Sequence, residues 1–279
     1  MVRLRELTWL IAVSAAAGFG TASAAPAAEP SGTAIAVNPA AQADGGAGFR
    51  VLVNDGAIYS GDKIVTGPSG QAQIKFRDET KLVVGPNSAL TVDAFIYSGN
   101  SAQKVSIDAL KGGFRFITGI SKKDAYSIST PTAVIAVRGT EFDFNVDRFD
   151  GETEVVMFGG TTLICPKILA GGVPNTQHEH CAVANRVCNM TIVPPGGEDV
   201  AEFKAGVQRN ALINRDFRYI RNQNRLNPEF RVDLVGCGSA ANFLNMPPAA
   251  PAGGGGPTQP PTASPPPSTG DGPIGGDTE

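Results

Sequence analysis

Short runs in which apolar and polar residues alternate constrain the fold of this chain more than any other feature. Residues 71–77 read QAQIKFR, and residues 141–147 read EFDFNVD. A period of two predicts β-strands that bury one face. Turn sequences rich in Gly, Pro, Asn and Asp separate such runs about every ten residues between Val51 and Cys165, with no apolar pattern of helical period among them. We therefore expect an all-β fold, which the period alone leaves open between a sandwich, a barrel and a solenoid.

The first 24 residues have the pattern of a signal peptide. Two arginines precede an apolar stretch at Leu7–Phe19, and Ala22–Ala24 supplies the small residues that a signal peptidase recognises. The stretch of about thirteen residues is shorter than the ~20 that a helix needs to span a bilayer, which disfavours a retained anchor. We predict a signal peptide over 1–24, cleavage before Ala25, and a periplasmic or secreted protein without a transmembrane span.

Two further segments are poor in large apolar side chains. Residues 25–48 are rich in Ala, Gly and Pro, and residues 247–279 hold ten prolines and eight glycines. Such compositions bury too little surface to offset the entropy lost when a chain becomes ordered. We expect a flexible lead-in over 25–48, one folded domain over 49–165, an accessory region over 166–246 and a disordered tail over 247–279.

Four motifs in the β-rich part occur in the order found in one protein family. They are G-D-x-I-x-T at Gly61–Thr66, D-x-[ST]-x-L at Asp78–Leu82, G-P-x-S at Gly85–Ser88 and T-P-x-A-x-I-x-V-R-G-T-x-F at Thr130–Phe142. With these motifs the chain resembles the FecR domain over about 110 residues. The resemblance implies a twisted β-solenoid-like domain of short strands over 49–165.

The resemblance also bears on function. The best-known FecR proteins regulate iron uptake: a cytoplasmic segment holds a sigma factor, one helix spans the membrane, and the FecR domain receives a signal in the periplasm. Only six residues precede the apolar stretch of this chain, so we expect no sigma-binding segment and no transmembrane signalling. The resemblance then implies an exported, stand-alone FecR domain with a sensory, regulatory or scaffold role.

The motif residues are expected to serve the fold rather than a reaction. The glycines suit turns that need a positive φ. The aspartates suit turn capping through backbone N–H groups, and Arg138 suits packing of its stem at a corner rich in carbonyl groups. The set consists of Gly61, Asp62, Thr66, Asp78, Gly85, Pro86, Thr130, Pro131, Arg138, Gly139 and Thr140.

Four cysteines come after the FecR-like motifs: Cys165, Cys181, Cys188 and Cys237. In an exported chain an even number indicates disulfides, here two, with three possible pairings. Cys165 ends one predicted strand and Cys188 begins the next, so these two residues are candidates to face each other.

A metal site is the alternative for this region. His178 and His180 alternate beside Cys181, and alternating residues of a strand point the same way. The helical spacing of zinc-protease histidines is missing, and oxidation competes for the thiol. We therefore expect no bound metal and no cofactor.

The hydrophobic period becomes helical in the accessory region. Apolar residues at spacings of three to five predict a helix over about 199–223, with Asp199 as its N-cap and Pro228 beyond its end. Four arginines share one face of this helix: Arg215, Arg218, Arg221 and Arg225. This face is either ordinary solvated surface or a contact for an anionic glycan, an acidic protein or, peripherally, a phospholipid surface.

The sequence offers little for catalysis or for nucleic-acid binding. Only two histidines occur, and neither a nucleophile-elbow motif nor a phosphate-binding glycine motif is present. The net charge of −3 gives no positive field for nucleic acid. We predict a non-enzymatic binding module with an envelope protein or glycan as partner. The alternatives are a structural protein that binds peptidoglycan or another polysaccharide and, less favoured, a polysaccharide-acting enzyme.

Overall fold

The computed structural model describes residues 28–99, 101–197, 199–203, 216–217, 219 and 222–237. The strands are β1 (Gly32–Asn38), β2 (Ala41–Asp44), β3 (Arg50–Val51), β4 (Gly56–Ile58), β5 (Lys63–Thr66), β6 (Gln71–Phe76), β7 (Lys81–Val84), β8 (Ala89–Ser98), β9 (Ser101–Ile117), β10 (Tyr126–Ser129), β11 (Ala133–Val146), β12 (Thr153–Pro166), β13 (Ile168–Leu169), β14 (Val173–Pro174), β15 (Ala182–Ala184), β16 (Met190–Val193) and β17 (Ala201–Phe203). Short 3₁₀ turns accompany them: η1 (Lys123–Ala125), η2 (Pro195–Gly197), η3 (Gln223–Arg225), η4 (Pro228–Phe230) and η5 (Val235–Cys237).

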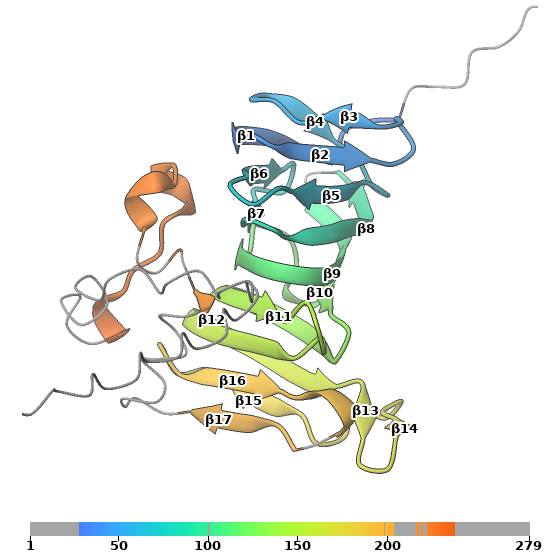
Figure 1. The fold of residues 1–279 in the computed structure, drawn as a ribbon, viewed down its shortest axis with the longest axis vertical. Coiled ribbons are helices and arrows are strands. Elements are labelled where there is room, and N and C mark those ends of the chain that lie inside the picture. The colour runs from blue at the N-terminus through green and yellow to red at the C-terminus, as the bar shows by residue number, and fades with distance from the viewer. Residues whose placement is uncertain are drawn as a thin grey trace, which may run out of the picture.

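Fifteen of these strands form one sheet, and β13 and β14 form a separate pair. The main path of the sheet runs β17-β16-β12-β11-β10-β9-β7-β6-β1-β4. Figure 1 shows the strands stacked along the long axis of the molecule, from β1–β4 at one end to β17 at the other. Every pairing of described strands is antiparallel except that of β9 with β10. The all-β prediction is confirmed, whereas the solenoid form is not confirmed by these pairings.

One face of the sheet carries the main hydrophobic core. Alternate residues of β6, β9 and β11 point into it, and Ile74, Phe116 and Phe142 are at most 1% exposed. Aromatic rings meet across neighbouring strands: the ring centroids of Phe114 and Phe144 lie 4.9 Å apart, and those of Phe116 and Phe142 lie 5.7 Å apart. Because β9 and β11 are paired in this part of the sheet, these contacts reinforce the strand pairing.

Residues 25–48 are not the flexible lead-in that their composition predicts, because β1 and β2 lie within them. β1 pairs with β6, and β2 pairs with β5. Ala34, Ala41 and Ala43 are at most 2% exposed and belong to the main core. Small side chains fill a narrow space when the opposite strands supply the large ones. The folded part therefore begins well before residue 49.

The other face of the sheet is covered by a C-terminal strap, the name used here for the described residues between 216 and 237. Its elements are drawn in orange beside the stack in Figure 1. Two small apolar clusters hold it: Phe217 packs in one with Val156, and Phe230 packs in the other with Val83. The alternating strands thus bury both faces along the strap, although the period of two predicts only one buried face.

The helix predicted over 199–223 does not begin at Asp199. Residues Ala201–Phe203 form β17, which pairs with β16 at the end of the sheet and so satisfies backbone groups of that strand. Pro228 opens the 3₁₀ turn η4. Residues 204–215 lie outside the described residues.

Several predictions fall wholly outside the described residues. They concern the signal peptide over 1–24, the tail over 247–279 and the arginines Arg215, Arg218 and Arg221. These stay predictions. Within the part of the chain that the structure describes, no helix has the length and apolar character needed to cross a membrane.

Candidate functional site

A buried ion pair joins two neighbouring strands beneath the strap. Arg115 of β9 lies opposite Asp143 of β11 in the strand register. Its Nε and Nη2 atoms donate hydrogen bonds of 2.6 and 2.9 Å to the two carboxylate oxygens. Both side chains are at most 1% exposed. The two parallel hydrogen bonds match the planes of guanidinium and carboxylate, which makes the contact strong and directional.

The same guanidinium also holds the strap. Its Nη1 atom donates to the side-chain oxygen of Gln223 at 2.6 Å and to the backbone oxygen of Phe230 at 3.3 Å. The ring centroids of Phe158 and Tyr219 lie 5.4 and 5.8 Å from its central carbon, within the range of cation–π attraction. A shift of the strap would leave this buried charge with fewer partners, which is costly.

Two buried acids have raised pKa values. Burial raises the pKa of the Asp143 carboxyl, while the charge and hydrogen bonds of Arg115 oppose the rise. Burial also raises the pKa of the Tyr126 phenol; hydrogen bonds with Thr80 and Ser121 oppose this, and the nearby Asp78 adds to it. These shifts result from packing under the strap and within the core.

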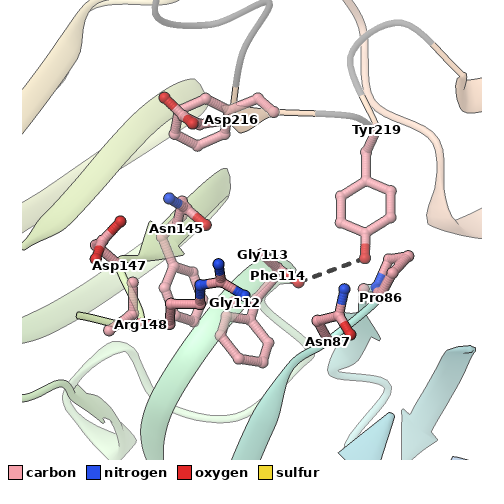
Figure 2. A pocket seen from close by; sticks show the side chains of 14 residues that line it. Pro86, Asn87, Gly112, Gly113, Phe114, Asn145, Asp147, Arg148, Asp216 and Tyr219 are labelled. Atoms are coloured by element: carbon pink, nitrogen blue, oxygen red, sulfur yellow. Dashed lines mark hydrogen bonds between the residues drawn. The ribbon is translucent and has the colours of Figure 1, made fainter. Parts of the chain in front are cut away.

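A cavity of about 250 Å³ opens where the strap leaves part of the outer face uncovered (Figure 2). Its floor includes Gly85 and Gly113, and the N–H of the first donates to the carbonyl of the second at 2.9 Å. Neither residue has a side chain, so space is left above the sheet at this point. The hydroxyl of Tyr219 donates to the same carbonyl at 3.4 Å and brings the strap across the cavity.

Polar side chains surround this floor. Figure 2 shows Asn145, Asp147 and Arg148 on one side and Asn87 near Tyr219 on the other. One oxygen of Asp147 accepts a backbone hydrogen bond of 2.6 Å from the following turn, and Asn145 donates to Glu154 at 3.1 Å. The polar lining residues are Asn87, Asn145, Asp147, Arg148 and Asp216. The cavity thus presents both donors and acceptors, as sites for polar molecules do.

A smaller cavity of about 120 Å³ adjoins the first and shares Pro86 and Tyr219 with it. Gln71 lines it and is 9% exposed, and its Nε2 atom has no hydrogen-bond partner among the described residues. Arg225, the described member of the four predicted arginines, also lines it from the exposed side. Buried donors without a hydrogen-bond partner are rare in folded proteins, which makes this amide a candidate ligand-binding group.

The two motif aspartates are buried and do more than cap turns. Asp62 accepts the N–H of the residue three positions earlier at 2.7 Å and forms an ion pair with Arg50. Asp78 accepts the N–H of the residue two positions later at 3.1 Å and the hydroxyls of Ser121 and Tyr126, each at 2.9 Å. Each carboxylate therefore connects segments that are distant in the sequence, as an internal structural link.

The motif glycines differ from one another. Gly61 and Gly139 have φ values of 86° and 71°, in keeping with turns that require glycine. Gly85 has no positive φ among the described backbone angles; a Cβ there would lie 2.1 Å from the hydroxyl oxygen of Tyr219, so close approach requires glycine at this position. Arg138 does not close a corner: it pairs with Thr161 through the backbone, and its side chain is exposed with no hydrogen bond or ion pair to described residues.

The motif threonines are buried and secure corners of the sheet. The hydroxyl of Thr66 accepts the N–H of Ser88 at 3.0 Å. The hydroxyl of Thr130 accepts the N–H of Ala133 at 2.8 Å, and the N–H of Thr140 donates to a neighbouring hydroxyl at 2.8 Å. These contacts are structural.

The motif prolines have different surroundings. Pro86 forms part of both cavities. Pro131 is exposed and lies against Gly151, where an added Cβ would be 2.7 Å away from its ring. Of the motif set, only Gly85 and Pro86 are among the described residues that line the two cavities.

The four cysteines form two disulfides, Cys165–Cys181 and Cys188–Cys237, as the even number predicts. The prediction that Cys165 and Cys188 face each other is wrong, because each forms a disulfide with another cysteine. The first disulfide closes the polar insert after β12. The second ties the end of the strap to the segment before β16, because the strap returns across the outer face of the sheet.

The two histidines do not alternate in a strand. His178 and His180 lie in turns, each with a φ of 55°, so the predicted common orientation does not apply. A carboxylate oxygen of Asp199 lies 3.8 Å from Nδ1 of His180, and both side chains are exposed. Cys181 is bonded in a disulfide. In the described ranges no cluster of three or more His, Cys, Asp or Glu residues is placed to hold a metal.

The sequence reasoning missed the residues that build the site. Arg115 and Asp143 are opposite charges on the polar sides of two predicted strands, which is a usable but weak signal for pairing. Gln71 begins an alternating run and looks like a surface residue. Tyr219 lies in a segment that no local pattern connects to the sheet.

The fold and the site define an all-β protein with a disulfide-tied strap and a polar cavity between strap and sheet. Residues 62–162 match the family model described as FecR protein. The chain therefore contains a segment, residues 62–162, that is similar to the FecR family.

Two crystal structures, each described as a "putative anti-sigma factor" from Parabacteroides distasonis ATCC 8503, are similar to this chain. Each is 13% identical with a TM-score of 0.38. The matches cover 52% and 55% of this chain and 61% and 64% of the other, less than two thirds of its length. No curated protein matches this chain.

Proposed function

We propose that this protein is a non-enzymatic FecR-domain module of the cell envelope, periplasmic or secreted, that binds a ligand or partner in a sensory, regulatory or scaffold role. The observation that carries the proposal is the polar cavity that the FecR domain and the strap form together. A molecule held there contacts both parts, so its binding is coupled to the position of the strap.

Several observations support this proposal. Two disulfides suit an oxidising compartment. The apolar segment ahead of Ala25 has the pattern of a cleaved signal peptide. Asp143 and Tyr126, the buried acids with raised pKa values, line neither cavity, which favours binding over acid–base catalysis there.

The experiment combines localisation with cross-linking. Cells that express the full chain are fractionated, and the N-terminus of the exported form is sequenced; we expect it to start at Ala25. A photo-cross-linking amino acid is placed at Asn87, the exposed rim of the cavity, and in a matched variant at Lys63 of β5, which is exposed and lines neither cavity. We expect specific cross-links only from Asn87. Retention in the cytoplasm, or identical cross-links from both positions, would contradict the proposal.

A second candidate function is that of a structural protein that binds peptidoglycan or another envelope polysaccharide. The mixture of amides, carboxylates and one tyrosine in the cavity favours it, because sugar hydroxyls both donate and accept hydrogen bonds. Co-sedimentation with purified peptidoglycan tests this candidate. Incubation with the same polymer, followed by measurement of released sugars, tests the enzymatic alternative.

A further inference from the structure

The two cavities are parts of one groove that Tyr219 and Pro86 divide. Both residues line the larger cavity of about 250 Å³ and the smaller one of about 120 Å³. Each volume lies below the roughly 300–1,000 Å³ typical of sites for drug-sized ligands. The groove therefore suits a ligand whose parts are the size of a single sugar ring or smaller.

The lining of the smaller cavity favours a ligand group that accepts hydrogen bonds. The Nε2 atom of Gln71 is buried, points at no described acceptor and lines this space. Arg225 lines the same space, and its guanidinium has no ion pair among the described residues. An amide donor and a guanidinium together favour a carboxylate or phosphate oxygen. The apolar wall is supplied by Leu226, which contributes no competing acceptor side chain.

The lining of the larger cavity favours a ligand with hydroxyl groups. One carboxylate oxygen of Asp147 accepts two backbone hydrogen bonds within its own turn, and the other oxygen has no hydrogen bond with the residues that the structure describes. Asn87 and Asn145 add amides, which both donate and accept. A hydroxyl group can donate to a carboxylate and accept from an amide. The lining carries two carboxylates, those of Asp147 and Asp216, against the one guanidinium of Arg148, so it disfavours a second acidic group on the ligand. Ligands with many acidic groups and ligands with apolar tails both fit this lining poorly.

Tyr219 stands where the two parts meet. Its hydroxyl is directed to the Gly113 carbonyl, so its ring forms a wall shared by both cavities (Figure 2). Aromatic rings provide a large apolar surface with a polar tip. Such a wall suits the C–H face of a sugar ring whose polar groups point elsewhere.

We propose that the groove binds a sugar acid: a polyhydroxylated ring in the larger cavity, with one carboxylate directed to Gln71 and Arg225. This assignment rests on the proposed function, because it takes the groove to be the ligand site of a binding module. It adds the chemical class of the ligand and names the two donors that select it.

The probe is a trisaccharide of two neutral glucose residues and one terminal glucuronic acid, so that it carries a single carboxylate; it is titrated into the exported, disulfide-bonded chain and followed by calorimetry. Maltotriose serves as a neutral sugar of equal length, and inorganic phosphate serves as an acid without a sugar. We expect the uronate to bind at least about tenfold more tightly than maltotriose, because only the uronate offers a charged group to the two donors. Phosphate should bind no better than maltotriose, because it lacks the sugar ring.

Two variants locate the site. Gln71→Met removes the amide while keeping the length of the side chain, and Arg225→Gln removes the charge. Each should weaken uronate binding about tenfold, and neither should lower the urea midpoint, since neither group has a partner among the described residues. Lys122→Gln is the matched control: it also removes one exposed positive charge, and Lys122 lines neither cavity.

Each outcome decides the inference. Uronate binding that is weakened by both site variants and unaffected by Lys122→Gln supports it. If maltotriose binds as tightly as the uronate, the proposed recognition of an acidic group is wrong. If phosphate binds as tightly as the uronate, the proposed recognition of a sugar ring is wrong. Uronate binding unchanged by Gln71→Met and Arg225→Gln overturns the site. If no probe binds while Asn87 still cross-links a partner in the envelope, the sugar acid is wrong and the proposed function stands.

Discussion

Arg115 and Asp143 face each other on neighbouring strands, fully buried, on the side of the sheet opposite the main core. The guanidinium is shared between this carboxylate and two groups of the strap, the side chain of Gln223 and the backbone oxygen of Phe230. A buried charge tolerates few alternative arrangements, so the pair determines where the strap can lie. The position of the strap in turn shapes the cavity beside it.

Asp143→Asn should destabilise the protein by about 3–5 kcal/mol, because it leaves the Arg115 charge buried beside a neutral amide. Urea denaturation followed by circular dichroism measures this loss. The control is Arg115→Met with Asp143→Leu, which removes both charges and should recover most of the stability. A single variant as stable as wild type would show that the pair is not ionised or not buried in solution.

Replacing Cys188 and Cys237 together by serine should loosen the strap while the FecR sheet stays folded. The disulfide joins the strap to the segment before β16, and removal of such a crosslink typically costs about 2–5 kcal/mol. Hydrogen exchange should accelerate in residues 222–237 and hardly change in β9 and β11. Serine at both Cys165 and Cys181 is the control and should affect the insert alone. Equal exchange in both double variants would contradict this role.

Stability should fall as the pH rises above about 10, through the buried phenol of Tyr126. Burial raises its folded pKa above the unfolded value near 10. Below pH 10 both states keep the proton; between the two pKa values only the unfolded state releases it, so alkaline conditions favour unfolding. Urea midpoints at pH 8 and pH 10.5 measure the slope. In Tyr126→Phe the slope should diminish, and the lost hydrogen bond to Asp78 should cost about 1 kcal/mol at pH 8.

A chain that begins at residue 49 should be less stable than one that begins at residue 28. The shorter chain lacks β1 and β2, so β6 loses a partner strand and Ala34, Ala41 and Ala43 leave the core. Loss of these methyl groups alone amounts to about 2 kcal/mol, at ~0.8 kcal/mol each. Denaturation curves of the two chains provide the comparison. Identical urea midpoints would mean that β1 and β2 contribute nothing to the fold.

Gly85→Ala should displace the strap. The new Cβ would lie 2.1 Å from the Tyr219 hydroxyl oxygen and 2.7 Å from the Gly113 carbonyl oxygen. Such overpacking typically costs about 1–3 kcal/mol. Gly46→Ala is the matched control, since an added Cβ there meets nothing within 4 Å. Tyr219→Phe should rescue part of the loss by removing one of the two contacts, and urea denaturation of the double variant tests this.

Much of the fold is predictable because its signals are local. The period of two in residues 71–77 and 141–147 predicts strands, and all of these residues except the last of each run lie in β6 and β11. The FecR motifs predict a domain over 49–165, and the family model matches residues 62–162 within it. Composition alone wrongly predicts a flexible segment over 25–48. Small residues can be packed in a core when opposing strands supply the large side chains, and composition does not reveal those strands.

The sequence by itself determined the strand pattern, the resemblance to the FecR domain and the presence of two disulfides, because alternation, turn chemistry and cysteine number are read over short distances. Only the tertiary structure decided that Cys188 bonds Cys237, that Asp143 is buried, and that Gln71 faces a cavity. Each of these depends on where the strap crosses the sheet, more than 70 residues after β11. Contacts of that separation arise from the packing of whole elements, and no local pattern carries their register.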